Sequence, residues 1–80
     1  SADEFESAVR SVMVTKLAIP ADALRQDARL NTDLQVDEDL GSELMGALGD
    51  ALEVRFPDDF LDGIHTYGQL SSAVRLSLIA

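Results

Sequence analysis

The chain has no cysteine, no tryptophan and a single histidine among its 80 residues. Without cysteine, neither a disulfide framework nor a thiolate zinc site can form. His65 stands alone, with no pattern of nucleophile and acid beside it, so it lacks the partners that metal or acid-base chemistry requires. We therefore expect no enzymatic activity and no transition-metal site, and we assign His65 to a loop.

The chain also lacks a calcium-binding loop, although its acidic residues suggest one at first sight. Asp37 and Asp39, followed by Glu43, have the alternation with which an EF-hand begins. Such a loop needs glycine at its sixth position and glutamate at its twelfth, whereas counting from Asp37 gives Ser42 and Leu48. The sequence therefore predicts neither a transition-metal site nor a calcium site.

Basic residues are few: six against fifteen acidic ones, for a net charge of -9. Nucleic acids and anionic membranes would repel such a chain, and basic protein surfaces are its natural complement. No apolar run approaches the roughly 20 residues needed to span a bilayer, and no secretion signal opens the sequence. We expect a soluble, cytoplasmic protein that binds neither nucleic acid nor membrane.

Three stretches of the chain place apolar residues three or four positions apart, the spacing that lines one face of a helix. The first runs from Asp3 to Pro20, where proline should close it. The second begins between Asp37 and Asp39, because carboxylates favour the positive end of the helix dipole, and ends near Phe56-Pro57. The third opens with a capping box, Thr66-Tyr67-Gly68-Gln69. The expected core residues are Phe5, Val9, Val12, Met13, Leu17, Leu40, Leu44, Ala47, Leu48, Ala51, Leu52, Leu70, Ala73, Val74 and Leu78.

A long loop joins the first two helices, from about residue 20 to residue 36, with a helical turn predicted near Ala21 to Leu24. Its apolar residues suggest that it is held against the bundle; they are Ile19, Leu24, Leu30 and Leu34. A short helix is also predicted over residues 58–63. The expected fold is a single all-α domain over residues 1–80, with three main helices and one short helix.

Acidic residues are concentrated in the middle of the chain. Ten of the fifteen lie between Asp33 and Asp62, against one basic residue, Arg55. Several of these acids fall on or beside the second predicted helix, where their charge would attract a basic partner. The predicted partner-binding residues are Asp37, Glu38, Asp39, Glu43 and Asp50.

This order of elements resembles that of the acyl carrier proteins of fatty-acid and polyketide synthesis. The family motif Asp-Leu-Gly-x-Asp-Ser-Leu corresponds to residues 33–39, its Ile-Pro-Asp to Phe56-Pro57-Asp58, and its Ile-x-Thr-Val-Gly to residues 64–68. The correspondence covers nearly the whole chain without gaps. The resemblance implies a carrier fold of three main helices and one short helix, and a protein that is not an enzyme.

Glu38 departs from the family pattern at its functional position. In the aligned register it stands where carriers bear phosphopantetheine on a serine, while Gln35 replaces the motif glycine and Asp39 the following leucine. A carboxylate offers no hydroxyl oxygen for that phosphodiester. Glu38 is then either one more acid at a helix N-terminus, worth about 0.3–1 kcal/mol, or a charge that a partner's basic pocket recognises.

Ser42 is the alternative attachment residue, within Leu40-Gly41-Ser42-Glu43-Leu44. Using it would remove about one helical turn between the serine and Phe56-Pro57, and would move the core leucines out of register. A phosphopantetheine arm on Ser42 therefore remains the second hypothesis.

Small residues recur on one side of the second helix, at Ser42, Gly46 and Gly49. Such a strip would let another helix or a partner surface approach the backbone closely, and an accident on a solvent-facing side explains it equally well.

The leading functional hypothesis is a carrier-like domain without covalent cargo or cofactor, which binds a basic face of a biosynthetic enzyme as an accessory, scaffold or decoy subunit. The alternative is a working acyl carrier protein with its arm on Ser42. A third possibility is an interaction module unrelated to acyl metabolism, since a fold does not dictate activity. Because the leading hypothesis involves no tethered acyl group, it predicts a tightly closed core, without a sizeable apolar channel that opens beside Glu38.

Overall fold

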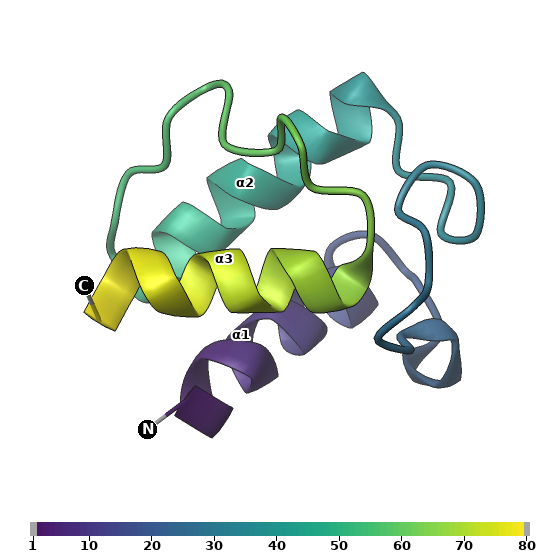
Figure 1. The fold of residues 1–80 in the computed structure, drawn as a ribbon, viewed down its shortest axis with the longest axis horizontal. Coiled ribbons are helices and arrows are strands. Elements are labelled where there is room, and N and C mark those ends of the chain that lie inside the picture. The colour runs from purple at the N-terminus through teal and green to yellow at the C-terminus, as the bar shows by residue number, and fades with distance from the viewer. Residues whose placement is uncertain (1, 80) are drawn as a thin grey trace.

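A computed structural model describes residues 2–79 of the chain. The helices within that part are α1 (Ala2–Thr15), the 3-10 helix η1 (Ala21–Ala23), α2 (Glu38–Leu52) and α3 (Tyr67–Ile79). Helix α1 packs against both α2 and α3, and the two ends of the chain lie on the same side of the bundle (Figure 1). The predicted all-α fold, with a long loop between its first two main helices, is confirmed. None of the helices in the described part is long and apolar enough to cross a lipid bilayer.

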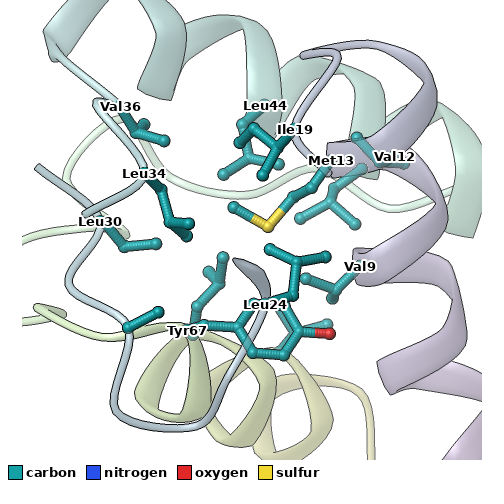
Figure 2. Packing of buried hydrophobic residues seen from close by; sticks show 14 residues of the cluster. Val9, Val12, Met13, Ile19, Leu24, Leu30, Leu34, Val36, Leu44 and Tyr67 are labelled. Atoms are coloured by element: carbon teal, nitrogen blue, oxygen red, sulfur yellow. The ribbon is translucent and has the colours of Figure 1, made fainter. Parts of the chain in front are cut away.

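The core is aliphatic, with one fully buried aromatic residue, Tyr67. Side chains from all three main helices and from the long loop converge in it (Figure 2). The four loop residues expected to hold the loop against the bundle are all buried: Ile19, Leu24, Leu30 and Leu34. The other buried apolar residues are Val9, Val12, Met13, Ala28, Val36, Leu44, Leu48, Leu70 and Val74. The loop is therefore part of the core rather than a free connection.

The structure corrects the sequence-based expectations at three places. Helix α1 ends at Thr15, before Pro20, because Ala18 has a left-handed backbone (φ 57°) that turns the chain away from the helix axis. Residues 58–63 form successive turns instead of a short helix, so the short helix of the fold is η1. Ala51 was expected in the core and is exposed, because it falls at the edge of the buried stripe of α2.

Three backbone hydrogen bonds join the long loop to the start of α3. The Leu30 N–H donates to the His65 carbonyl (2.9 Å) and the Tyr67 N–H donates to the Ala28 carbonyl (2.9 Å). Beside them the Gly68 N–H donates to the Gln26 carbonyl (3.0 Å), and a Cβ at position 68 would lie 2.8 Å from that carbonyl oxygen. Glycine at position 68 therefore permits the closest approach between the two segments.

The predicted capping box at the start of α3 is confirmed. The Gln69 N–H donates to Thr66 Oγ1 (3.1 Å), while Gln69 Oε1 accepts from the N–H groups of Thr66 (3.2 Å) and His65 (2.7 Å). Side chains thus satisfy three backbone donors that no helical carbonyl can reach.

Tyr67 carries a polar group into the core without a partner. Its ring is fully buried, and neither its hydroxyl nor that of the buried Ser71, one turn further along α3, has a hydrogen-bond partner among the residues that the structure describes. An unsatisfied buried hydroxyl costs about 1–3 kcal/mol. Helix α3 therefore adds apolar packing to the core, while the desolvation of its two hydroxyl oxygens lowers the stability of the fold.

Replacing Tyr67→Phe should raise the free energy of unfolding by about 1 kcal/mol, because the ring stays and the unsatisfied hydroxyl is lost. Urea titration followed by circular dichroism measures the change. Thr66→Ala provides the contrast: it removes a hydroxyl that caps α3 and should lower the free energy of unfolding by about 0.5–2 kcal/mol. A Tyr67→Phe variant less stable than the parent would contradict this account of the core.

Candidate functional site

The N-terminus of α2 is built around Asp37. Asp37 is the N-cap residue, with an extended backbone (φ -86°, ψ -171°), and its Oδ1 accepts a hydrogen bond from the Leu40 N–H (2.8 Å). Glu38 is the first helical residue and Asp39 the second, and all three acids are exposed. Three carboxylates therefore surround the positive end of the helix dipole, where negative charge is stabilising.

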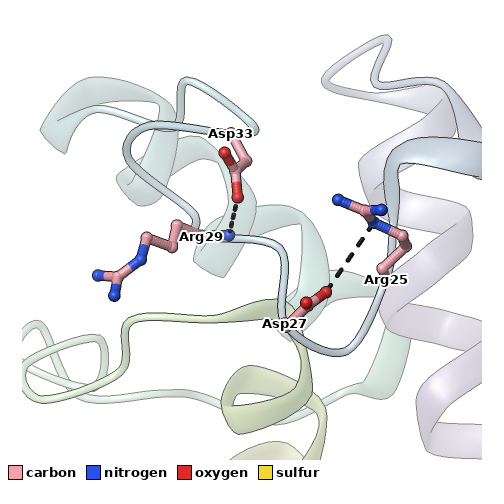
Figure 3. A network of polar contacts seen from close by, with 4 residues as sticks. All are labelled: Arg25, Asp27, Arg29 and Asp33. Atoms are coloured by element: carbon pink, nitrogen blue, oxygen red, sulfur yellow. Dashed lines mark hydrogen bonds and ion pairs between the residues drawn. The ribbon is translucent and has the colours of Figure 1, made fainter.

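A tight turn before α2 sets where the helix begins. Asp33 Oδ2 accepts from the Arg29 N–H (2.9 Å), as Figure 3 shows, and the Leu34 N–H donates to the Arg29 carbonyl (3.0 Å). The Val36 N–H then donates to the Leu30 carbonyl (2.7 Å). Between these bonds Gln35 has a left-handed backbone (φ 56°), a conformation that glycine adopts without steric cost. Buried Leu34 and Val36 on either side of Gln35 hold the turn in place.

The five acids expected to bind a partner are all exposed, and together we call them the acidic surface of α2: Asp37, Glu38, Asp39, Glu43 and Asp50. The helical repeat of 3.6 residues puts Asp39, Glu43 and Asp50 on one face. None of the five carboxylates forms an ion pair within residues 2–79. The ion pair in Figure 3, Arg25 with Asp27, lies in the long loop (3.9 Å) and is itself highly exposed. No basic side chain of the described residues is therefore paired with the acidic surface, which stays accessible to an external partner.

The small residues of α2 have different surroundings. A Cβ at Gly41 would lie 3.0 Å from Leu61 Cδ1, and one at Gly49 would lie 2.7 Å from the Val54 carbonyl oxygen, so both glycines accommodate the chain that follows α2. Gly46 has nothing within 4 Å of such an atom, and Ser42 is exposed in the second turn. Of the predicted strip, Ser42 and Gly46 are open to the outside while Gly49 packs against its own chain.

A surface groove of about 860 Å³ runs along α2. Behind it, the residues of α2 that face the core, Leu44 and Leu48, are fully buried. One wall is the side of α2 that carries Glu38, Ser42 and Gly46, and the other is the segment of residues 54–65. The groove is present because the second wall consists of turns and not of a packed helix. In these turns the Phe60 N–H donates to the Pro57 carbonyl and the Ile64 N–H to the Leu61 carbonyl. Sequence reasoning missed the groove because the apolar pattern of this segment also fits a packed helix.

The groove brings together residues that sequence reasoning treated separately. Glu38 and Ser42, the two residues considered for attachment, both line it, and so do Gly46, Asp50 and the exposed His65. Asp39 and Glu43 do not line the groove, although they share a helix face with Asp50. Within residues 2–79, no group of three or more histidine or acidic side chains is arranged to hold a metal ion.

Gln35→Gly should raise the free energy of unfolding by about 1 kcal/mol, because it relieves the cost of a side chain in the left-handed region. Gln35→Ala is the matched control: it also removes the long side chain but keeps Cβ, so it should leave stability nearly unchanged. Thermal unfolding of the three proteins compares them. Equal stability of the glycine and alanine variants would show that the turn is not strained.

The sequence of the chain can be compared with the sequences of known proteins. No protein-family model matches the chain. The chain is 32% identical over 77 residues to the acyl carrier protein of Saccharopolyspora erythraea, a match that covers 96% of this chain and 80% of that protein. The similarity extends over nearly all of the described helices and over the turn that precedes α2. The chain belongs to the acyl carrier protein family.

Proposed function

We propose that this chain is a non-enzymatic, cytoplasmic member of the family that carries no phosphopantetheine and binds a basic face of a fatty-acid or polyketide type biosynthetic enzyme, as an accessory, scaffold or decoy subunit. The observation that carries the proposal is the start of α2 at Glu38, immediately after its cap Asp37. The family's motif has its serine at this place, and here a carboxylate occupies it.

Helix geometry supports the absence of an arm. Ser42 lies four residues after Glu38, which corresponds to about 6 Å along the helix axis and a full turn inside α2. Moving the attachment point there would shift the arm relative to Asp37 and to the turn at Gln35, which together define the exposed end of the helix. An enzyme that recognises this end would find Glu38 in place of a hydroxyl.

The charge of the chain supports a protein partner. The acidic surface of α2 is exposed and forms no ion pair with any other residue from 2 to 79, and the net charge of -9 extends its field beyond contact distance. Such a field accelerates the encounter with a basic surface and repels polyanions. Glu38 adds a negative charge where a carrier has its phosphodiester. A basic pocket of the partner that binds a phosphodiester would therefore also bind the Glu38 carboxylate.

One observation favours a second candidate function, that of a working acyl carrier protein. Ser42 is exposed, and it lines a groove of about 860 Å³ that has apolar residues in its lining. An arm on Ser42 would have its cargo beside that groove. The two candidate functions differ in whether the protein carries a covalently bound phosphopantetheine group, so the intact mass of the protein distinguishes them.

Incubation with coenzyme A and a broad-specificity phosphopantetheinyl transferase should leave the intact mass of the protein unchanged. The double variant Glu38→Ser/Asp39→Leu restores the family motif on the same scaffold, and it should gain the mass of one phosphopantetheine group. This variant is the positive control, since it tests whether the transferase recognises the rest of the surface. Modification of the parent protein that disappears in Ser42→Ala would overturn the proposal in favour of the working carrier.

Neutralising part of the acidic surface of α2 should slow association with a purified ketosynthase. For Asp39→Asn/Glu43→Gln we expect the association rate constant to fall about threefold at low salt, because long-range attraction weakens. The dependence of that rate on ionic strength should become shallower. Asp22→Asn/Asp27→Asn, two exposed acids in the long loop, is the control of equal charge, and it should have a smaller effect. Equal effects of the two pairs would mean that net charge acts rather than this surface.

A further inference from the structure

Asp62 differs from every other aspartate of the chain in the residue that follows it. The chain has ten aspartates, and Asp62 alone precedes a glycine; the others precede alanine, leucine, phenylalanine or an acidic residue. A side chain on the following residue hinders the approach of an aspartate carboxyl group to the backbone nitrogen that joins the two residues. Glycine has no such side chain. The bond between Asp62 and Gly63 is therefore the aspartyl peptide bond at which this approach is least hindered.

The fold leaves both groups at this bond free. Asp62 and Gly63 are exposed, within the turns of residues 58–63. The Asp62 N–H donates to the Asp59 carbonyl (3.0 Å) and the Ile64 N–H to the Leu61 carbonyl (3.0 Å), whereas the Gly63 N–H between them has no hydrogen-bond partner within residues 2–79. The Asp62 carboxylate forms neither a hydrogen bond nor an ion pair in that part of the chain. Neither the nitrogen nor the carboxyl group is therefore held in place.

The space around Gly63 is also open. Gly63 has a left-handed backbone (φ 81°), and a Cβ built on it would meet no atom within 4 Å. Rotation of the backbone at this point therefore brings no clash with a neighbouring element, and glycine adopts both signs of φ at little cost. Exposed turns with few buried contacts open locally at a small free energy. The folded state therefore gives this bond little protection compared with the unfolded chain.

We propose that Asp62–Gly63 is a site of spontaneous isomerisation in the folded protein, at which the aspartate becomes isoaspartate. The Gly63 nitrogen bonds to Asp62 Cγ, and its hydrogen leaves with the carboxyl hydroxyl group as one molecule of water, which closes a five-membered succinimide ring. Water then adds to the ring and breaks the bond between the Gly63 nitrogen and the Asp62 backbone carbonyl carbon. The chain continues through Cγ, the mass is unchanged, and the reaction needs no oxidant, reductant or enzyme.

The modification changes the length of the backbone in a segment that contacts α2. Isoaspartate adds one methylene group to the main chain inside the turn that the Ile64 to Leu61 hydrogen bond closes. Leu61 in turn packs at Gly41, where a Cβ would lie 3.0 Å from Leu61 Cδ1. The number of carboxylates is the same before and after, so the net charge stays at -9. Isomerisation therefore alters the shape of this segment and its contact with α2, and not the charge of the protein.

The test is prolonged incubation of the folded protein at physiological temperature and pH, followed by digestion with trypsin. Cleavage after Arg55 and Arg75 releases one peptide, residues 56–75, that contains three of the aspartates. Fragmentation by electron transfer should locate isoaspartate at Asp62, and an isoaspartyl methyltransferase with S-adenosylmethionine should methylate the incubated protein but not the fresh protein. No isoaspartate at Asp62, or equal amounts at Asp58 and Asp59, would overturn the inference.

The contribution of the fold is measured by repeating the incubation in urea. Because the turn is exposed and the Gly63 N–H is free, the rate in the folded protein should lie within about tenfold of the rate in the unfolded chain. Circular dichroism of the two samples confirms that one is folded and the other is not. A folded protein that reacts more slowly than this would show that the turn protects the bond, which contradicts the proposal.

Three variants test the chemistry. Asp62→Glu keeps the charge but would have to close a six-membered ring, so methylation after incubation should fall about tenfold or more. Gly63→Asn keeps Asp62 and tolerates the left-handed backbone, but its side chain hinders the nitrogen, and isoaspartate at Asp62 should fall to a similar extent. Asp59→Glu is the matched control at a neighbouring exposed aspartate and should leave the rate unchanged. Undiminished methylation of Asp62→Glu would refute the assignment.

The effect on α2 has its own measurement. The NMR spectrum of the incubated, ¹⁵N-labelled protein should contain new amide signals for Gly41, Leu61 and Ile64, in proportion to the isoaspartate formed. The signal of Val9, which is buried in α1, should not be doubled. New signals confined to Asp62 and Gly63 would contradict the transmission of the change to α2.

Discussion

The attachment of the long loop to the start of α3 is the constraint on which the rest of the structure depends. Two backbone hydrogen bonds between residues 28–30 and residues 65–67 tie together segments that lie far apart in the sequence. On one side they position the turn that leads into α2, and on the other they anchor the end of the segment that forms the second wall of the groove. Buried Ala28, Leu30 and Tyr67 exclude water around these bonds, which makes breaking them more costly.

The acidic residues are concentrated in the part of the chain between these two segments, from residue 33 to residue 62. Ten carboxylates between residues 33 and 62 repel one another, and no ion pair among the described residues relieves the acidic surface of α2. The core must offset this repulsion, and it does so through a continuous cluster to which every main helix and the long loop contribute. A surface that is electrostatically unfavourable in the free protein becomes favourable when a basic partner covers it. This balance is what a binding module requires, whether or not it also carries a prosthetic group.

Much of the fold could be predicted because its signals are local. Apolar spacing identified the three helices, the Thr66 to Gln69 pattern identified the cap of α3, and the acids near Asp37 identified the start of α2 within a residue. The end of α1 could not be predicted from Pro20, because a left-handed Ala18 ends the helix earlier and a propensity pattern does not show a positive φ. The groove was missed for a related reason. Apolar spacing in residues 58–64 shows that this segment faces the core, but not whether it forms a helix that fills the space or turns that leave it open.

The turns of residues 57–64 link the fold to its candidate site. The segment touches α2 closely near Gly41, where Leu61 lies 3.0 Å from the place of a Cβ, and the glycine at that position makes the contact possible. At Gly46, which also lines the groove, a Cβ would meet no atom within 4 Å. The Phe56 and Phe60 rings, whose centroids are 4.8 Å apart, stiffen the segment from within. The chain that follows α2 therefore approaches the helix at two glycines, at Gly41 and again at Gly49, where a Cβ would lie 2.7 Å from the Val54 carbonyl oxygen, and the groove lies along the helix between these contacts.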